Sequence, residues 1–332
     1  MGIYIEYDKP FLTYDEQIDR LRNHYNLIIE DSDIPFARSA LSTISYYDLV
    51  NGYQEYTMQN GVFKAGTTLR YLFHYYLFDK DIQNIMLKNS LLVENIFKTK
   101  LSYVLAKNFG VDVYDYLNPD HFKNNIRRNI YFEKVKREIF KRIDKFKPQP
   151  TTYYKKHHNH IPPWILLRNV EFGNAINLYR LLKSPYKEEL AKSLIKGNYD
   201  QKLCIDFSLS ALNFIKNYRN DIAHNLKFGS SHHSLLPFNT TLKIINNPEI
   251  TDGISEFNNL YAYILAIHIL LNEPVLQAKL YFDLSGTLLP KAGMNVNALS
   301  VHSKIVLNYL TANKMPLNFG ERLNILLPQE TN

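Results

Sequence analysis

The chain has 332 residues, of which 45% are hydrophobic and 21% are charged, and its formal net charge is +7 at pH 7. This length and apolar content allow a sizeable buried core in one large domain or two modest ones. Fourteen Pro and twelve Gly are too few for a disordered or fibrous chain. Cys204 is the single cysteine, which excludes an intrachain disulfide and a zinc-knuckle spacing and fits a reducing cytoplasm.

Nothing in the sequence points to a membrane. The first six residues lack the basic and long apolar regions of a signal peptide. The longest apolar run, Tyr263–Leu271, contains His268 and is far shorter than a membrane span. We therefore expect a soluble protein of the cytoplasm with no membrane partner.

The N-terminal segment predicts a helical unit over residues 1–62. Thr13 and Glu16 have the spacing of a capping box, which predicts a helix start with Ile18 and Leu21 buried behind it. A second helix is expected from near Pro35. Asn60-Gly61 then indicates a turn that ends the unit.

Apolar residues at helical spacing continue in the next segment. We expect one helix from Thr67 or Thr68 through Phe78 and a long helix from Asp79 to Asn108. Glu94 and Lys98 are i, i+4 neighbours on the long helix, and one of two interpretations of Glu94 is a surface ion pair of small value.

The basic excess is concentrated between Asp120 and His160, where twelve Lys or Arg face four Asp or Glu. A helix over Phe122–Phe146 is predicted to carry most of these cations: Arg127, Arg128, Lys134, Lys136, Arg137, Lys141 and Arg142. Such a patch is typical of a nucleic-acid partner. The alternative is a solvated face produced by codon bias.

A loop that follows Pro148-Gln149-Pro150 is expected to hold Lys155, Lys156 and His157 and to face RNA. The three histidines between His157 and His160 have no nearby carboxylate or cysteine at ligand spacing, so we predict neither a metal nor another cofactor.

The remaining chain is expected to be largely helical. Helices are predicted over 164–182, from near Asp200, over 255–272 and over 297–310, and a short strand over Thr241–Ile245. The segment 183–199 is expected to link two of the helices.

The stretch Arg219–Asn225 lies at the end of the helix that starts near Asp200. The core-facing stripe of this helix recurs every three or four residues: Leu203, Phe207, Ala211, Phe214, Tyr218 and Ile222. Arg219 and His224 fall roughly 140° apart, on opposite flanks of that stripe. An imidazole can move the protons of a ribose 2′-hydroxyl and a leaving 5′-oxygen, and a guanidinium can stabilise phosphoryl charge. The alternative is a histidine that merely favours the helix dipole.

This stretch resembles the Arg-Asn-x-x-x-His motif of the HEPN superfamily of α-helical ribonucleases. Other segments resemble, in order, the bacterial Abi abortive-infection family of the AbiD and AbiF type: Lys9-Pro10-Phe11-Leu12-Thr13, Gln17-Ile18 with Leu21, Ile44-Ser45-Tyr46-Tyr47-Asp48-Leu49, Phe63 with Gly66-Thr67, Leu77-Phe78-Asp79, Val93-Glu94-Asn95, Pro162-Pro163-Trp164 and Phe172-Gly173. The chain departs from the family in one place: relatives tend to carry an acidic residue just after the Pro-Pro-x-Trp segment, where this chain has Arg168-Asn169-Val170-Glu171. Little resembles the family beyond residue 226.

The resemblance implies an all-α protein with a HEPN-like four-helix core over residues 63–330, preceded by the N-terminal unit and interrupted by a basic helical insertion at 120–160. It implies Arg219, Asn220 and His224 as catalytic residues, supported by Glu94 and Asp221. The second interpretation of Glu94 follows from the resemblance: the long helix would pack near the catalytic one, and Glu94 would orient Arg219. It also implies a homodimer in which two motifs share one cleft, in a bacterial cytoplasm.

Three functional hypotheses follow from the residues and the resemblance together. The first is a metal-independent endoribonuclease that acts as a phage-defence toxin and is regulated by a small noncoding RNA. The second is a non-catalytic RNA-binding protein. The third is a sensor of a phage protein, which would use the unmatched C-terminal third.

Overall fold

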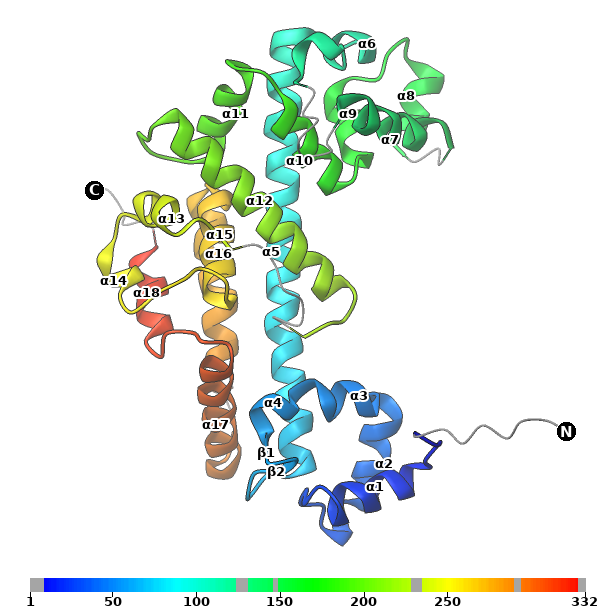
Figure 1. Ribbon diagram of the computed structural model, residues 1–332, viewed down its shortest axis with the longest axis vertical. Helices are drawn as coiled ribbons and strands as arrows, with labels where there is room; N and C mark the ends of the chain where they lie inside the picture. Colours follow the sequence, from blue (N-terminus) through cyan, green and yellow to red (C-terminus); the bar gives the residue numbers. More distant parts are fainter. Residues whose placement is uncertain (1–8, 124–130, 146–148, 228–234, 290–293, 328–332) are drawn as a thin grey trace, which may run out of the picture. The chain divides into compact units, whose positions relative to one another are not determined.

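Helices account for nearly all of the regular structure in the computed structural model, which confirms the all-α class (Figure 1). It describes residues 9–123, 131–145, 149–227, 235–289 and 294–327, with the backbone alone described over 142–145. Two units are distinguished by their internal packing: Met1–Ile82 with Thr287–Ala312, called unit 1, and Gln83–Gly286 with Asn313–Asn332, called unit 2. The predicted division of the sequence at residues 62 and 63 stays a prediction.

Unit 1 contains short helices, one hairpin, the first part of a long helix and one helix from near the C-terminus. Its elements are α1 (Tyr14–Asn23), η1 (Asp31–Asp33), α2 (Ile34–Thr43), α3 (Tyr46–Leu49), η2 (Asn51–Tyr53), α4 (Gln54–Thr57), β1 (Met58–Gln59), β2 (Val62–Phe63), the start of α5 (Leu69–Phe109) and α17 (Val296–Ala312). The predicted helix over 297–310 corresponds to α17 and is confirmed.

The predicted capping box and turn are both confirmed in unit 1. Glu16 N–H donates to Thr13 Oγ1 at 3.3 Å, and Thr13 N–H donates to Glu16 Oε2 at 2.7 Å. Asn60 and Gly61 have φ values of 52° and 79°, which the turn between β1 and β2 requires. The two short strands were not predicted.

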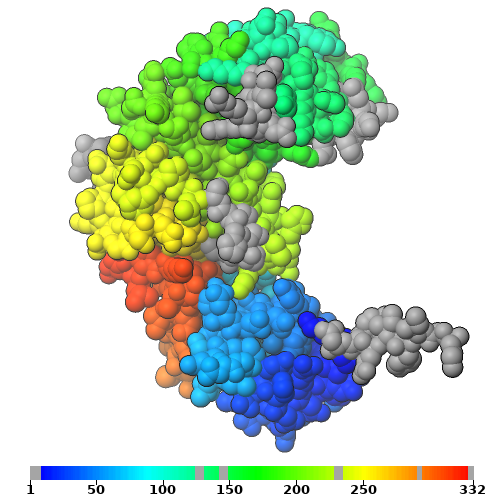
Figure 2. Space-filling view, in the orientation of Figure 1, coloured from blue at the N-terminus to red at the C-terminus, as the bar shows by residue number. Residues whose placement is uncertain are grey.

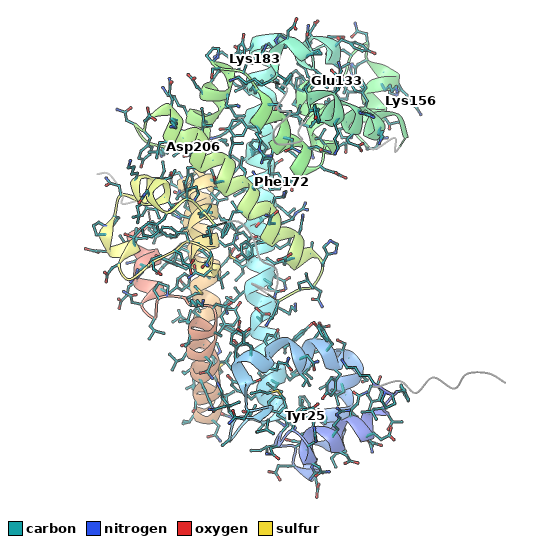
Figure 3. All side chains as sticks on the ribbon, viewed as in Figure 1. Tyr25, Glu133, Lys156, Phe172, Lys183 and Asp206 are labelled. Atoms are coloured by element: carbon teal, nitrogen blue, oxygen red, sulfur yellow. The ribbon has the colours of Figure 1, made fainter. Side chains whose placement is uncertain are left out.

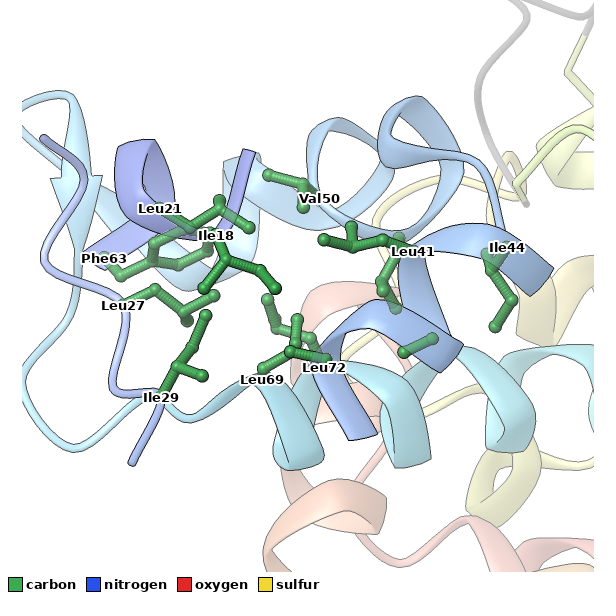
Figure 4. Close-up of a cluster of buried hydrophobic side chains, with 13 residues drawn as sticks. Ile18, Leu21, Leu27, Ile29, Leu41, Ile44, Val50, Phe63, Leu69 and Leu72 are labelled. Carbon is green, nitrogen blue, oxygen red and sulfur yellow. The ribbon is translucent and has the colours of Figure 1, made fainter. Parts of the chain in front are cut away.

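The core of unit 1 is a cluster of buried hydrophobic side chains that includes residues of α1, α2, β2 and the start of α5 (Figure 4). Leu21, Leu41, Phe63 and Leu72 belong to it, and each is almost fully buried. Because four elements share this cluster, α1 and the hairpin are held to the first turns of α5.

A buried carboxylate joins α17 to the rest of unit 1. Asp79 on α5 accepts hydrogen bonds from Tyr53 Oη at 2.9 Å and from Tyr309 Oη at 2.8 Å. Burial, followed by the charge of Asp79, raises the pKa of both tyrosines far above the usual range. Both phenols therefore stay protonated and keep donating to the carboxylate.

Unit 2 contains the rest of α5 and most of the remaining helices: α6 (Val113–Tyr116), η3 (Pro119–His121), α7 (Phe132–Lys145), α8 (Thr151–His157), α9 (Pro163–Asn169), α10 (Phe172–Leu181), α11 (Tyr186–Leu194), α12 (Gln201–Ala223), α13 (Phe238–Ile245), α14 (Pro248–Thr251), α15 (Leu260–Leu271), α16 (Pro274–Leu288) and α18 (Phe319–Ile325). α12 packs against α10, α11, α13 and α15 and crosses α5 (Figure 1). Nearly every side chain of α15 is buried.

Several boundaries differ from those expected. The helices predicted on either side of Phe78 and Asp79 form one helix, α5, since no Gly or Pro interrupts the chain there. The helix predicted over 164–182 is two helices, α9 and α10, because Val170 and Glu171 are extended. The segment 183–199 contains α11 and is not only a linker.

Two predicted non-helical segments are helices. The strand expected over Thr241–Ile245 lies in α13, where Thr241 Oγ1 donates to the carbonyl of Pro237 at 2.8 Å and so satisfies its hydroxyl inside a helix. The loop expected to carry Lys155, Lys156 and His157 is the last turn of α8, although His158–His160 lie beyond it. Over the residues that the structure describes, no helix is both long and apolar enough to cross a membrane.

His268 on α15 predicts a pH dependence of stability. The side chain is only 9% exposed, and burial lowers the pKa of its imidazole to about 4. A histidine in the unfolded chain has a pKa of about 6.5, so between pH 6.5 and 4 the unfolded state binds a proton that the folded state does not. The free energy of unfolding therefore falls as the pH is lowered through this window, by up to about 3 kcal/mol, and His268 contributes no pH dependence above it.

The test is urea unfolding of the wild type and of His268→Leu from pH 8 to pH 4. The difference in unfolding free energy between the two proteins should be flat above pH 6.5 and should shift in favour of the variant below it. His157→Gln, at an exposed histidine, is the matched control and should leave the pH profile unchanged. Parallel profiles for wild type and His268→Leu would show that the wild-type imidazole takes up its proton in the folded state.

Candidate active site at the end of helix α12

Both ends of α12 are capped by its own sequence. At the start, Asp200 accepts hydrogen bonds from the N–H groups of Lys202 at 2.9 Å and Leu203 at 3.2 Å, which confirms the predicted start. At the end, Asn225 has a φ of 61°, a left-handed conformation that asparagine tolerates better than most residues. A Schellman motif results, because Leu226 N–H donates to the Asp221 carbonyl at 3.0 Å and Asn225 N–H to the Ile222 carbonyl at 2.9 Å.

This cap sets the position of His224. α12 ends at Ala223, and His224 is its C-cap residue, with φ −93° and ψ 15°, so the histidine lies at the end of the helix as the sequence predicts. Its N–H still donates to the Asn220 carbonyl at 3.0 Å, which keeps it in the last turn. The side chain is exposed, and the imidazole makes no hydrogen bond or ion pair to any described residue. The C-terminal part of α12 lies at the surface (yellow-green in Figure 2).

Arg219 is held by two side chains. Its Nη2 donates to Glu94 Oε2 on α5 at 3.0 Å, and its Nη1 donates to Asn220 Oδ1 at 3.0 Å. These two bonds use two of the five N–H donors of a guanidinium. The structure thus joins three of the residues proposed from the sequence, which come from two helices far apart in the chain.

Glu94 is shared between two cations. Its Oε1 accepts from Lys98 Nζ at 2.7 Å while Oε2 accepts from Arg219. The exposed fractions of the side chains are 13% for Glu94, 12% for Lys98 and 28% for Arg219. The two interpretations of Glu94, an i, i+4 pair with Lys98 or a partner of Arg219, therefore both describe contacts that exist together. The pair of Glu94 with Lys98 is largely buried, so the prediction that it lies on the surface is wrong.

Tyr218, the residue before Arg219, belongs to a buried group with Tyr263 and Ser90. The ring of Tyr218 stacks on the buried ring of Tyr263 at 5.2 Å, and Tyr263 Oη and Ser90 Oγ share a hydrogen bond of 2.6 Å. Burial, aided by the charge of Asp221, raises the pKa of Tyr218 to about 12, and burial also raises that of Tyr263. Both phenols are therefore neutral at physiological pH. No local pattern in the sequence identifies Tyr263 or Ser90 as neighbours of the motif.

Asp221, proposed as a supporting residue, is buried on α12. Its carbonyl accepts a hydrogen bond from the N–H of Leu226 in the helix cap.

The core-facing stripe of α12 differs from the expected one near the start of the helix. Cys204 is buried there, whereas Leu203, which was expected to be buried, is only partly buried.

The cations predicted to bind RNA lie on α7, on α8 or outside the described residues. Lys134, Arg137 and Lys141 are exposed on α7, whereas Lys136 is half-buried with its Nζ 5.8 Å from the centre of the Phe132 ring. Lys155, Lys156 and His157 are exposed on α8; Figure 3 labels Lys156 there and Glu133 on α7. Arg127, Arg128 and the side chain of Arg142 lie outside the described residues. α7 packs on α10, and α10 packs on α12.

The sequence reasoning missed two further cations between α10 and α12. Lys216 is half-buried, and a Cβ atom at Gly173 would lie 3.6 Å from its Cδ, so Lys216 follows the surface of α10 closely. Burial and then the positive charge of Arg180 lower the pKa of Lys216. These cations extend the basic character of unit 2 from α7 towards α12. Over the described part of the chain, no group of three His, Cys, Asp or Glu residues is arranged to hold a metal ion.

One family model matches the chain. Its description is Abi-like protein, and it covers residues 39–228, more than half of the sequence. The matched segment includes Glu94, all of α12 and the motif at its end, and it stops before α13. Neither a curated protein nor a solved structure matches the chain.

Removal of the shared carboxylate should destabilise unit 2. In Glu94→Ala the largely buried Lys98 and the partly buried Arg219 lose their common partner, and we expect the free energy of unfolding to fall by about 2 kcal/mol in urea titrations. Glu189→Ala is the matched control, because Glu189 also binds a lysine, Lys107, and an asparagine, Asn108, in a more exposed setting. That variant should lose less than about 1 kcal/mol. Equal losses in the two variants would contradict a special role for burial at Glu94.

Proposed function

The chain belongs to the family of Abi-like proteins, and from this premise we propose that it is a metal-independent endoribonuclease of phage defence, of the HEPN type. Membership in the family indicates abortive infection as its general role. One observation supports the chemistry above all others: Arg219 is oriented by Glu94 and Asn220 in the helical turn that ends at the solvent-exposed His224.

In the proposed reaction the imidazole of His224 takes the proton of a ribose 2′-hydroxyl. The 2′-oxygen then forms a bond to the adjacent phosphorus, and the bond from phosphorus to the 5′-oxygen breaks. The leaving 5′-oxygen takes a proton from an imidazolium, so the products are a 2′,3′-cyclic phosphate and a 5′-hydroxyl. Arg219 stabilises the charge on the phosphoryl oxygens.

The way in which Arg219 is held suits the stabilisation of charge on a phosphoryl group. Its bonds to Glu94 and Asn220 fix the guanidinium plane, and none of its other three N–H donors is bonded to a described residue. A guanidinium that is already oriented loses little conformational freedom when it binds a phosphate. Asn220 takes the role of positioning this group.

We also propose that the active form is a homodimer. An in-line displacement needs a base at the attacking oxygen and an acid at the leaving oxygen, and each motif supplies one imidazole. Two motifs facing each other across one cleft would supply both. The basic surface of α7 and α8 is proposed to hold a small noncoding RNA that regulates this activity.

A second candidate function is RNA binding without cleavage. The observation in its favour is that the His224 imidazole has no orienting partner among the described residues, whereas a general base is commonly oriented by a third group. Cleavage assays on the motif distinguish the two functions.

His224→Ala should lower the rate of cleavage of single-stranded RNA by about 10² to 10⁴, because the proton transfers lose their catalyst. Arg219→Lys should also reduce the rate, since an ammonium cannot reproduce the planar bonds to Glu94 and to a phosphate. The measurement is single-turnover cleavage in EDTA, with detection of a 2′,3′-cyclic phosphate on the product.

His24→Ala serves as the control, because His24 is an exposed histidine of unit 1 outside the motif. Its rate should equal that of the wild type. A His224→Ala protein that cleaves RNA at the wild-type rate would refute the assignment. An inactive wild type that still binds RNA would favour the second candidate function.

The basic surface predicts a salt-dependent RNA affinity. Replacement of the exposed residues Lys134, Arg137 and Lys141 by Glu should weaken RNA binding and reduce the slope of log affinity against log salt by about 2, at roughly 0.7 per lost contact with single-stranded RNA. Filter binding from 50 to 300 mM salt measures this. Replacement of the exposed Lys192, Lys196 and Lys202 by Glu is the charge-matched control in the same unit. The same slope in both triple variants would exclude α7 as the docking surface.

A further inference from the structure

An open pocket of about 400 Å³ lies between α5 and α9, beside the carboxylate that orients Arg219. α5 contributes Glu94, Asn95, Lys98 and Thr99 to its lining, and α9 contributes Trp164 and Arg168. Ile165, Leu166 and Leu167 are buried and anchor α9, whereas Trp164 and Arg168, four residues apart, are exposed on the same side of the helix. The pocket lies wholly within unit 2.

Trp164 offers a stacking surface in this pocket. It is the only tryptophan of the chain, and 47% of it is exposed. Among the described residues its ring has no aromatic or cationic partner, and its indole N–H has no acceptor. Large aromatic residues with a free face are the groups on which unstacked bases of single-stranded RNA rest.

The charges of the pocket favour an anionic ligand. Lys98 and Arg168 carry two positive charges against the single negative charge of Glu94, which Lys98 and Arg219 already bind. Arg168 is exposed and forms no hydrogen bond or ion pair with a described residue. Its guanidinium can therefore hold a phosphate without first breaking a bond within the described protein.

Two polar side chains give the pocket hydrogen-bonding edges. Asn95 and Thr99 are four residues apart on α5, and both are exposed. The Asn95 amide offers donors and an acceptor, and the Thr99 hydroxyl offers either, as the edge of a nucleobase requires. Neither side chain is hydrogen-bonded to a described residue. A volume of about 400 Å³ is also within the range of small-ligand sites.

We propose that this pocket binds a nucleotide, with the base stacked on Trp164, its edge bonded to Asn95 and Thr99, and a phosphate on Arg168. The nucleotide comes either from the RNA substrate, in which case the pocket selects the base beside the cleaved bond, or from free solution, in which case it is an effector. The first source rests on the proposed ribonuclease function, and the second does not. Glu94 links either source to Arg219, because it lines the pocket and also binds Arg219.

The single tryptophan makes the test direct. The fluorescence of Trp164 is titrated in His224→Ala protein with AMP, GMP, CMP and UMP, with a single-stranded RNA of eight nucleotides, and with ribose 5-phosphate. Stacking should give a saturable quench with a nucleotide or with the RNA and none with ribose 5-phosphate. A quench by a mononucleotide identifies a free nucleotide as sufficient, and a quench by RNA alone identifies a residue of the RNA as the ligand.

Two variants test the contacts. Arg168→Ala keeps the Trp164 fluorophore. Half-maximal quenching of this variant should need a ligand concentration at least 10-fold higher than for the protein with Arg168. Trp164→Leu should weaken binding roughly 10-fold in calorimetry, as expected for the loss of one stacked base. Tyr103→Leu, at an exposed aromatic residue of α5 that does not line the pocket, is the matched control and should bind as the wild type does.

The proposal is overturned if no nucleotide or RNA quenches Trp164, or if Arg168→Ala and Trp164→Leu bind as tightly as the wild type. These outcomes are separate from the fate of the proposed function. Cleavage that depends on His224 but has the same KM in Trp164→Leu would leave the ribonuclease intact and remove the pocket. A quench by mononucleotides in a wild-type protein that cleaves no RNA would support the nucleotide pocket and refute the ribonuclease function.

Discussion

The carboxylate of Glu94 is the contact on which the candidate site depends. It lies almost buried between α5 and α12 and accepts one hydrogen bond from Lys98 and one from Arg219. Lys98 lies on the same helix as Glu94 and binds only Oε1, so Oε2 of this largely buried carboxylate has a cationic partner only when α12 brings Arg219 to it, which favours that register of the two helices. A shift of α12 by one turn would leave both Glu94 and Arg219 without that partner. The orientation of the guanidinium is thus a property of helix packing.

His224 is positioned by a different kind of interaction. The Schellman motif at Asn225 involves only residues within the last two turns of α12, and it ends the helix at the residue before His224. Local capping therefore exposes the imidazole, while a contact across 125 residues of sequence holds Arg219. A substitution in α5 can move the guanidinium without moving the imidazole. The two chemical groups of the motif are stabilised independently.

Local chemistry is predictable from the sequence, whereas of the long-range contacts only that between Glu94 and Arg219 is suggested beforehand, by the resemblance to a family. Thr13, Asp200 and Asn60-Gly61 act through hydrogen bonds or dihedral angles within a few residues, and each was recognised. Thr241–Ile245 was assigned to a strand because β-branched residues favour strands, yet tertiary packing places it in α13. The stacking of Tyr263 on Tyr218 and the pocket at Trp164 join helices that no short pattern connects.

The charge balance around Glu94 leaves a paired arginine able to attract the polyanion that the proposed function requires. One carboxylate binds two cations, so the group formed by Lys98, Glu94 and Arg219 keeps a net charge of +1. Each cation is oriented by Glu94, but the group as a whole is not neutralised. At an effective dielectric constant of about 20, a unit charge 4 Å from a phosphate oxygen contributes about 4 kcal/mol of attraction. The residual charge, together with that of Arg168, therefore favours a phosphate beside the site while the side chains remain fixed by their internal bonds.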